Sequence, residues 1–279
     1  MPAIIYDNKP LLKRLSEELR AEAVKFRQQH QRQARLAQVI VGHDAAAELY
    51  SRQLVRSCRN IGLGCATFSF PFETEEQELR KELEILNNDP GNDGVVLLLP
   101  LPAHIRQRAV TEVLRPEKDV DGLGPRNAGN LLLGFPNFIP STADTILTVL
   151  QDTALPVAGR HAVIVGRSNI GGKPTALVLM RLDATVTVCH TYTQNLPELT
   201  READILVVSV GRPGLITADM VKPGAVVLDA GINTVNGQVV GDVDFAGVKQ
   251  VASFITPVPG GLGPLTHLTL IRHTLLGPQ

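Results

Sequence analysis

The chain has 279 residues, of which 44% are hydrophobic and 20% charged, with 24 glycines and 19 prolines, a composition typical of a soluble α/β protein of two domains or one large one. Its 27 basic and 28 acidic side chains leave a net charge of −1, which argues against nucleic acid or a membrane as partner and favours a small-molecule substrate. The 3 cysteines and 7 histidines lack the spacing of metal ligands or of a disulfide framework, so we expect no metal site. No apolar run approaches the roughly 20 residues that span a bilayer, and the N-terminal segment has no targeting pattern. We therefore expect a cytoplasmic protein.

The first half of the chain alternates helix and strand patterns. Amphipathic helices are predicted over 11–29, 45–63 and 74–89, and strands over 34–42, 65–70 and 94–99. Such alternation predicts a parallel sheet covered on both faces, with ligands at the carboxyl ends of its strands. The run GVVLLL at 94–99 is apolar enough to be a central strand of that sheet.

The pattern restarts near residue 140. A connecting helix is predicted over 141–153, followed by strands that begin near residues 161, 184, 203 and 225. This is the pattern of a second doubly wound unit. We therefore predict a substrate domain at 1–140, a Rossmann-like domain at 141–263, and a C-terminal helix, 264–279, that joins the first domain.

The segment VIVGRSNIGG resembles a phosphate-binding turn. It places Gly166 at the end of a buried strand, and Gly171 and Gly172 at the start of a helix, where backbone N–H groups and the helix dipole would meet a phosphate. Ser168 stands where a dinucleotide fingerprint has its second glycine, so an ordinary strand-to-helix turn remains an alternative. Arg167 suits a 2′-phosphate, because the next strand ends in CHTYT and not in an acidic residue.

Two further loops are candidates for ligand contact. KDVDGLGP holds Asp119 and Asp121, and a carboxylate there could accept hydrogen bonds from an aminopyrimidine edge, although an exposed turn is the alternative. TPVPGGLGP has a rigid backbone that can approach a ligand closely, with a plain turn again possible.

Tyr50, Leu54 and Cys58 share one face of the helix predicted at 45–63. An aromatic residue and a leucine four positions apart usually pack in a core, so packing is the favoured interpretation and a binding wall the alternative.

Five segments, VGHDAAAELY, GVVLLLPLP, KDVDGLGPRNAG, VGRSNIGGKP and TPVPGGLGPLT, stand in the order and spacing of the methylenetetrahydrofolate dehydrogenase/methenyltetrahydrofolate cyclohydrolase family. The resemblance covers essentially the whole chain. It implies a homodimer of two-domain α/β subunits, with a reduced folate as substrate and NADP as cofactor on the second domain.

The resemblance also implies roles for individual residues. Tyr50 would stack on the aminobenzoyl ring of the folate, Asp121 would hold the pterin edge, and Pro259, Gly260 and Gly261 would line the folate cleft. The residues expected to hold the dinucleotide are Thr142, Gly166, Arg167, Ser168, Ile232 and Thr266, with Thr191 reaching toward the 2′-phosphate.

Two positions depart from the family pattern. The family has Y-x-x-x-K, and this chain has Leu54 in place of the catalytic lysine; the family has VQLPLP, and this chain has Leu98 in place of the glutamine. We expect both leucines to contact the substrate and cyclohydrolase activity to be lost or much reduced, because hydrolysis needs a positioned proton-transfer group. Two alternatives stay open: a paralogue acting on another reduced-pterin or one-carbon substrate, and a catalytically silent folate- or dinucleotide-binding subunit.

Overall fold

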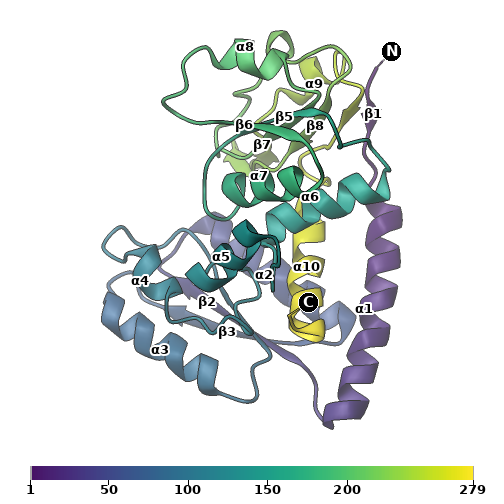
Figure 1. Ribbon diagram of the computed structural model, residues 1–279. Coiled ribbons are helices and arrows are strands. Elements are labelled where there is room, and N and C mark those ends of the chain that lie inside the picture. Colours follow the sequence, from purple (N-terminus) through teal and green to yellow (C-terminus); the bar gives the residue numbers. More distant parts are fainter. Residues whose placement is uncertain (1, 279) are drawn as a thin grey trace. The chain divides into compact units, whose positions relative to one another are not determined.

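The computed structural model describes residues 2–278, which divide into two compact α/β units (Figure 1). Residues 13–141 and 267–278 form the three-stranded unit, and residues 2–12 and 142–266 form the six-stranded unit. Two α/β units with parallel sheets confirm the predicted fold class. Within the described residues, no helix is both long and apolar enough to cross a membrane.

The three-stranded unit is built on a parallel sheet with the order β3-β2-β4. Its strands are β2 (Arg35–Val41), β3 (Gly64–Phe70) and β4 (Gly94–Leu97). Its helices are most of α1 (Lys9–His30), then α2 (Ala45–Ile61), α3 (Glu76–Asn88), α4 (Gln107–Thr111) and α5 (Pro125–Leu133), and the greater part of α10 (Gly263–Leu276). The strand order reverses at β2, so the loops after β2 and β4 are the expected position for a ligand.

Strand β4 differs from its predicted position. All its residues are buried, but it lies at the edge of the sheet and β2 lies at the centre. The loop at residues 118–120 covers that edge, because Val95 donates its N–H to the carbonyl of Lys118 at 2.6 Å and pairs with Asp119 in an isolated bridge. The apolar run therefore reflects burial by a loop and not a central place in the sheet.

The six-stranded unit has a fully parallel sheet with the order β1-β11-β8-β7-β5-β6. Its strands are β1 (Ile4–Ile5), β5 (His161–Val165), β6 (Thr185–Cys189), β7 (Ile205–Val208), β8 (Val226–Asp229) and β11 (Phe254–Ile255). The remaining elements are α6 (Ser141–Asp152), α7 (Gly172–Arg181), α8 (Leu196–Arg201), the 3₁₀ turn η1 (Ala218–Met220), α9 (Phe245–Val248), and a hairpin of β9 (Asn233–Val235) and β10 (Gln238–Val240).

The core of this unit follows from the continuous apolar sequences of β5, β7 and β8, which suit strands covered on both faces. The chain places β6 on one side of β5 and β7 on the other, so the strand order reverses at β5. In sheets of this kind, ligands bind beyond the carboxyl ends of the strands at such a reversal.

The N-terminal residues correct the predicted domain limits. The prediction placed residues 1–140 together in the substrate domain, but β1 pairs in parallel with β11, as Ile4 opposite Phe254 and Ile5 opposite Ile255. Residues 2–12 therefore complete the sheet of the six-stranded unit.

Candidate functional site

Helix α2 carries the first predicted site residue, Tyr50. The helix begins after Asp44, whose side chain accepts a hydrogen bond from the N–H of Ala47 at 2.8 Å, and it ends at Gly62, which has a left-handed φ of 92°. The helix thus begins shortly after the carboxyl end of β2. Tyr50 is half-buried, so part of its side chain remains accessible in this position.

Leu54 and Leu98 do not line an open surface. Leu54 is 0% exposed and is among the largest fully buried side chains, and Leu98 is 6% exposed. In this structure Leu54 packs against its protein neighbours, which differs from the expectation that it presents an apolar surface to a ligand. The packing interpretation of the Tyr50, Leu54 and Cys58 face holds for Leu54 and for Cys58, which is also 0% exposed.

Tyr50 contacts a histidine that sequence analysis did not identify. The rings of Tyr50 and His267 have centroids 4.5 Å apart and an interplanar angle of 64°, an edge-on contact. His267 is 5% exposed, and its Nδ1 lies 3.4 Å from the hydroxyl of Ser57. The one signal for it in the sequence is its position directly after TPVPGGLGPLT.

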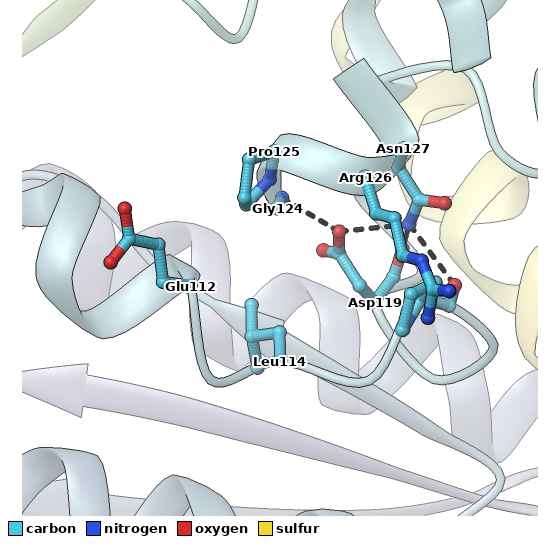
Figure 2. Close-up of a pocket in the computed structure, with 8 residues that line it drawn as sticks. Glu112, Leu114, Asp119, Gly124, Pro125, Arg126 and Asn127 are labelled. Atoms are coloured by element: carbon cyan, nitrogen blue, oxygen red, sulfur yellow. Dashed lines mark hydrogen bonds between the residues drawn. The ribbon is translucent and has the colours of Figure 1, made fainter. Parts of the chain in front are cut away.

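The KDVDG loop holds two carboxylates with different environments. Asp119 is 1% exposed and accepts hydrogen bonds from the N–H groups of Leu123 at 3.0 Å and Gly124 at 2.7 Å, and from the amide of Asn127 at 2.9 Å. Figure 2 shows this carboxylate turned toward Gly124 and Asn127 at the start of α5. Burial raises the pKa of Asp119 to about 6, against the effect of these hydrogen bonds.

Asp121 is less engaged with the protein. Its Oδ1 accepts a hydrogen bond from the N–H of Ser141 at 2.8 Å. Burial raises the pKa of Asp121 above the ordinary value, while hydrogen bonds from the side chain and backbone of Ser141, and then the charge of His273, act to lower it. The carboxylate oxygens of Asp119 already accept hydrogen bonds within the loop and from α5. Asp121 is therefore the better candidate for contacting a ligand.

A cavity of about 440 Å³ lies beside the side chain of Asp119. It is lined by residues of the loop and of α5, namely Glu112, Leu114, Pro116, Asp119, Gly124, Pro125, Arg126 and Asn127 (Figure 2). Of these, only Asp119 was considered from the sequence, and neither Tyr50 nor Asp121 borders the cavity. The cavity therefore includes part of the KDVDGLGPRNAG segment but none of the residues to which the resemblance assigns a role.

The glycine-rich segment forms the predicted turn between β5 and α7. Gly166 has a φ of 131°, and a Cβ at this position would lie 2.2 Å from the carbonyl oxygen of Ser209. A Cβ on Gly172 would lie 2.1 Å from the carbonyl oxygen of Gly166. Both positions thus require glycine for the chain to turn this tightly into the first turn of α7.

Arg167 and Ser168 are exposed polar residues of this turn. Arg167 lies two residues after the end of β5, and its guanidinium carbon lies 5.9 Å from the ring centre of Tyr192. Ser168 accepts a hydrogen bond from the N–H of Gly171 at 3.1 Å through its hydroxyl. Thr191, beside Tyr192, is also exposed. A cation, a hydroxyl and the amino end of a helix at one strand end can together bind a phosphorylated ligand.

The remaining predicted contacts of the six-stranded unit fall into two groups. Ile232 follows β8 and is 54% exposed, and the loop of Pro259, Gly260 and Gly261 follows β11. Both segments therefore lie at the carboxyl ends of the parallel strands, as the turn after β5 does. Thr142 and Thr266 lie on helices α6 and α10, and Thr266 donates its hydroxyl to the carbonyl of Gly263 at 2.7 Å.

Three comparisons with known proteins agree on the family. The "Tetrahydrofolate dehydrogenase/cyclohydrolase, catalytic domain" model matches residues 6–121, and the "Tetrahydrofolate dehydrogenase/cyclohydrolase, NAD(P)-binding domain" model matches residues 140–278. The bifunctional protein FolD of Halalkalibacterium halodurans is 44% identical over 275 residues, which cover 99% of this chain and 98% of that protein.

Solved structures give the same result. The bifunctional enzyme FolD of Campylobacter jejuni superposes with a TM-score of 0.93 at 36% identity and covers 98% of each chain. The dehydrogenase-cyclohydrolase of Trypanosoma brucei, solved with NADP and an inhibitor, has a TM-score of 0.93 at 32% identity and covers 99% of this chain and 97% of its own. The glycine turn after β5, the Asp119–Asp121 loop and these whole-length matches together show that the chain belongs to the tetrahydrofolate dehydrogenase/cyclohydrolase family.

Proposed function

We propose that this protein oxidises 5,10-methylenetetrahydrofolate to 5,10-methenyltetrahydrofolate with NADP as hydride acceptor, and that its cyclohydrolase activity is lost or much reduced. The observation that carries the proposal is the retention of the dinucleotide turn and of Tyr50 and Asp121, while the lysine position holds the fully buried Leu54. Whole-length similarity to bifunctional enzymes supports the folate substrate.

The two reactions of the family make different demands on the protein. Hydride transfer is chemistry of the nicotinamide, and the protein chiefly binds and orients the two reactants. Hydrolysis of the methenyl cation requires attack by water and transfer of protons, to which a positioned acid or base contributes typically about 10²–10⁴-fold. Replacement of lysine and glutamine by Leu54 and Leu98 therefore affects hydrolysis first.

NADP is the proposed cofactor in preference to NAD. The exposed Arg167 lies next to the phosphate-binding turn, and Thr191 and Tyr192 follow the adjacent strand without an acidic residue that would bind an unphosphorylated ribose. The positive end of the α7 dipole suits the pyrophosphate, because the glycines let the chain turn tightly from β5 into the helix.

Asp121 and Tyr50 are the proposed substrate contacts of the three-stranded unit. The carboxylate of Asp121 would accept hydrogen bonds from the amino group and ring N–H of the pterin, and Tyr50 would stack on the aminobenzoyl ring. Pro259, Gly260 and Gly261 are proposed to contribute backbone contacts to the folate.

The decisive experiment measures both reactions separately with the purified protein. Methylenetetrahydrofolate and NADP should give NADPH with accumulation of methenyltetrahydrofolate, and added methenyltetrahydrofolate should decay at the uncatalysed rate. Rapid hydrolysis by the wild-type protein would show that another group moves the proton, and the claim of lost cyclohydrolase activity would fail.

A gain-of-function variant tests the role of the two leucines. Leu54→Lys with Leu98→Gln restores the family pattern and should increase methenyl hydrolysis relative to wild type. Leu54→Met with Leu98→Met serves as the matched control, because it changes both side chains without adding a charge or an amide. Since Leu54 is fully buried, the lysine variant must be shown to be folded before its activity is compared.

Wild-type protein that binds both ligands but oxidises no methylenetetrahydrofolate would favour one of the two other candidates. The coordinated change of lysine and glutamine to leucine is what favours a paralogue with a different reduced-pterin or one-carbon substrate. Screening other reduced folates with NADP would separate that activity from a catalytically silent binding subunit.

A further inference from the structure

The contacts of His267 place its ring against the turn of α2 that carries Leu54. Tyr50 lies one helical turn before Leu54 and Ser57 lies one turn after it. The imidazole touches both, with its centroid 4.5 Å from that of the Tyr50 ring and its Nδ1 3.4 Å from the Ser57 hydroxyl. A polar side chain from α10 thus lies beside the position where the family has its lysine.

One nitrogen of the His267 ring makes no hydrogen bond to the described part of the protein. Nδ1 faces Ser57, whereas Nε2 is buried and has no hydrogen-bond partner among residues 2–278. An unpaired buried polar atom is destabilising relative to a paired one, so such atoms usually serve a ligand or a bound water. The site as built therefore has an unused hydrogen-bonding group next to Tyr50.

The ring is also neutral under ordinary conditions. Burial lowers the pKa of His267 to about 4, so no positive charge is present near pH 7. Oxidation of methylenetetrahydrofolate creates a cationic product, and a neutral imidazole does not repel it as an ammonium group would. A neutral ring can donate or accept one hydrogen bond through Nε2, depending on its tautomer.

We infer that His267 is a substrate-binding residue of this protein, whose Nε2 hydrogen-bonds the reduced folate next to Tyr50 in place of the polar contact that Leu54 cannot make. This inference rests on the proposed folate substrate. It assigns His267 a role in binding and positioning the folate, and none in moving protons for hydrolysis.

Three variants of His267 separate this role from a structural one. His267→Gln places an amide near the position of Nε2, His267→Asn places one near the position of Nδ1, and His267→Leu removes both nitrogens. The Kd of tetrahydrofolate, measured by calorimetry, should rise about 5- to 100-fold in the Leu and Asn variants and stay within about threefold of wild type in the Gln variant. The Kd of NADP should not change in any of them.

The opposite pattern would overturn the inference. Recovery of binding by Asn and not by Gln would show that the ring acts only through Ser57, and an unchanged Kd in the Leu variant would show that no contact exists. Ser57→Ala is the matched control, because it removes the Nδ1 partner but leaves Nε2 in place, and it should change the Kd less than threefold.

Calorimetry does not depend on turnover, so the two proposals can fail separately. Wild-type protein that binds tetrahydrofolate through His267 but produces no NADPH would refute the dehydrogenase proposal and leave the inference standing. Wild-type protein that does not bind tetrahydrofolate at all would refute the inference. Each variant is first compared with wild type by thermal unfolding, so that loss of binding is not mistaken for loss of fold.

Discussion

Arg167 allows a direct test of cofactor choice. Arg167→Ala should weaken NADP binding by about 1–3 kcal/mol, the usual range for a lost hydrogen bond to a charged group, and should leave NAD binding nearly unchanged. Fluorescence titration with both dinucleotides measures the two affinities. Arg181→Ala is the control, because this exposed arginine lies in the last turn of α7. Equal losses for NADP and NAD would contradict a 2′-phosphate contact.

His267 should make stability depend on pH in a defined window. Its folded-state pKa is lowered to about 4 from 6.5, so the unfolded chain binds the proton more readily and acid favours unfolding. The contribution is fully present above pH 6.5 and is lost as pH falls toward 4, by roughly 3 kcal/mol in total. Urea unfolding of wild type and His267→Gln across this window measures it. The variant should lose less stability on acidification, and parallel curves would show that the folded-state pKa is not lowered.

The sequence was informative about some residues and not about others. The glycines at 166 and 172 could be predicted, since a tight turn between strand and helix restricts the side chain at those positions whatever surrounds it. Leu54 was placed on the correct helix face, but its complete burial depends on packing that periodicity does not describe. His267 is distant from Tyr50 along the chain, so only the fold brings the two rings together.

The turn between β5 and α7 should be sensitive to a single methyl group. Gly166→Ala would place a Cβ 2.2 Å from the carbonyl oxygen of Ser209, so the turn must shift. We expect a loss of about 2 kcal/mol or more in the free energy of unfolding, together with weaker dinucleotide binding. Gly159→Ala is the matched control, because Gly159 also has a positive φ, 72°, but no atom within 4 Å of the added Cβ. Similar losses of stability in the two variants would show that the positive φ causes the effect and that the contact with Ser209 does not.

The start of α5 depends on Asp119. Asp119→Ala would leave the N–H groups of Leu123 and Gly124 and the amide of Asn127 without their acceptor, and we expect a loss of about 3 kcal/mol or more in stability. Asp119→Asn should cost less, because it keeps an acceptor oxygen and avoids burying a charge. Urea unfolding measures both. Asp121→Ala should weaken folate binding with a smaller loss of stability than Asp119→Ala. A larger loss of stability in Asp121→Ala, with weaker folate binding in Asp119→Ala, would show that the two carboxylates have the opposite roles.

Elements with strong local patterns were predictable, whereas their neighbours in the sheet were not. The apolar run of β4 correctly indicated a buried strand, but burial can come from a covering loop as well as from flanking strands, and here residues 118–120 provide it. β1 has only two residues, Ile4 and Ile5, which is too short for any periodicity to show. Its place in the six-stranded sheet is set by pairing with β11, a contact that no local pattern predicts.

The oligomeric state is expected from the family resemblance alone. We predict a homodimer, with a mass near twice the 30.1 kDa of the single chain. Light scattering coupled to size-exclusion chromatography at micromolar concentration measures the mass. A value near 30.1 kDa that persists as concentration rises would contradict the prediction.

The pairing of β1 with β11 also affects how the protein is made. Ile4 and Ile5 leave the ribosome early, but their partners Phe254 and Ile255 are synthesised only after most of the rest of the chain. At roughly 5–20 residues per second, the wait is on the order of tens of seconds. The three-stranded unit likewise lacks residues 267–278 until they emerge. Synthesis stopped anywhere between residues 13 and 253 would thus leave both units incomplete, and each unit can be completed only after its last segment has been synthesised.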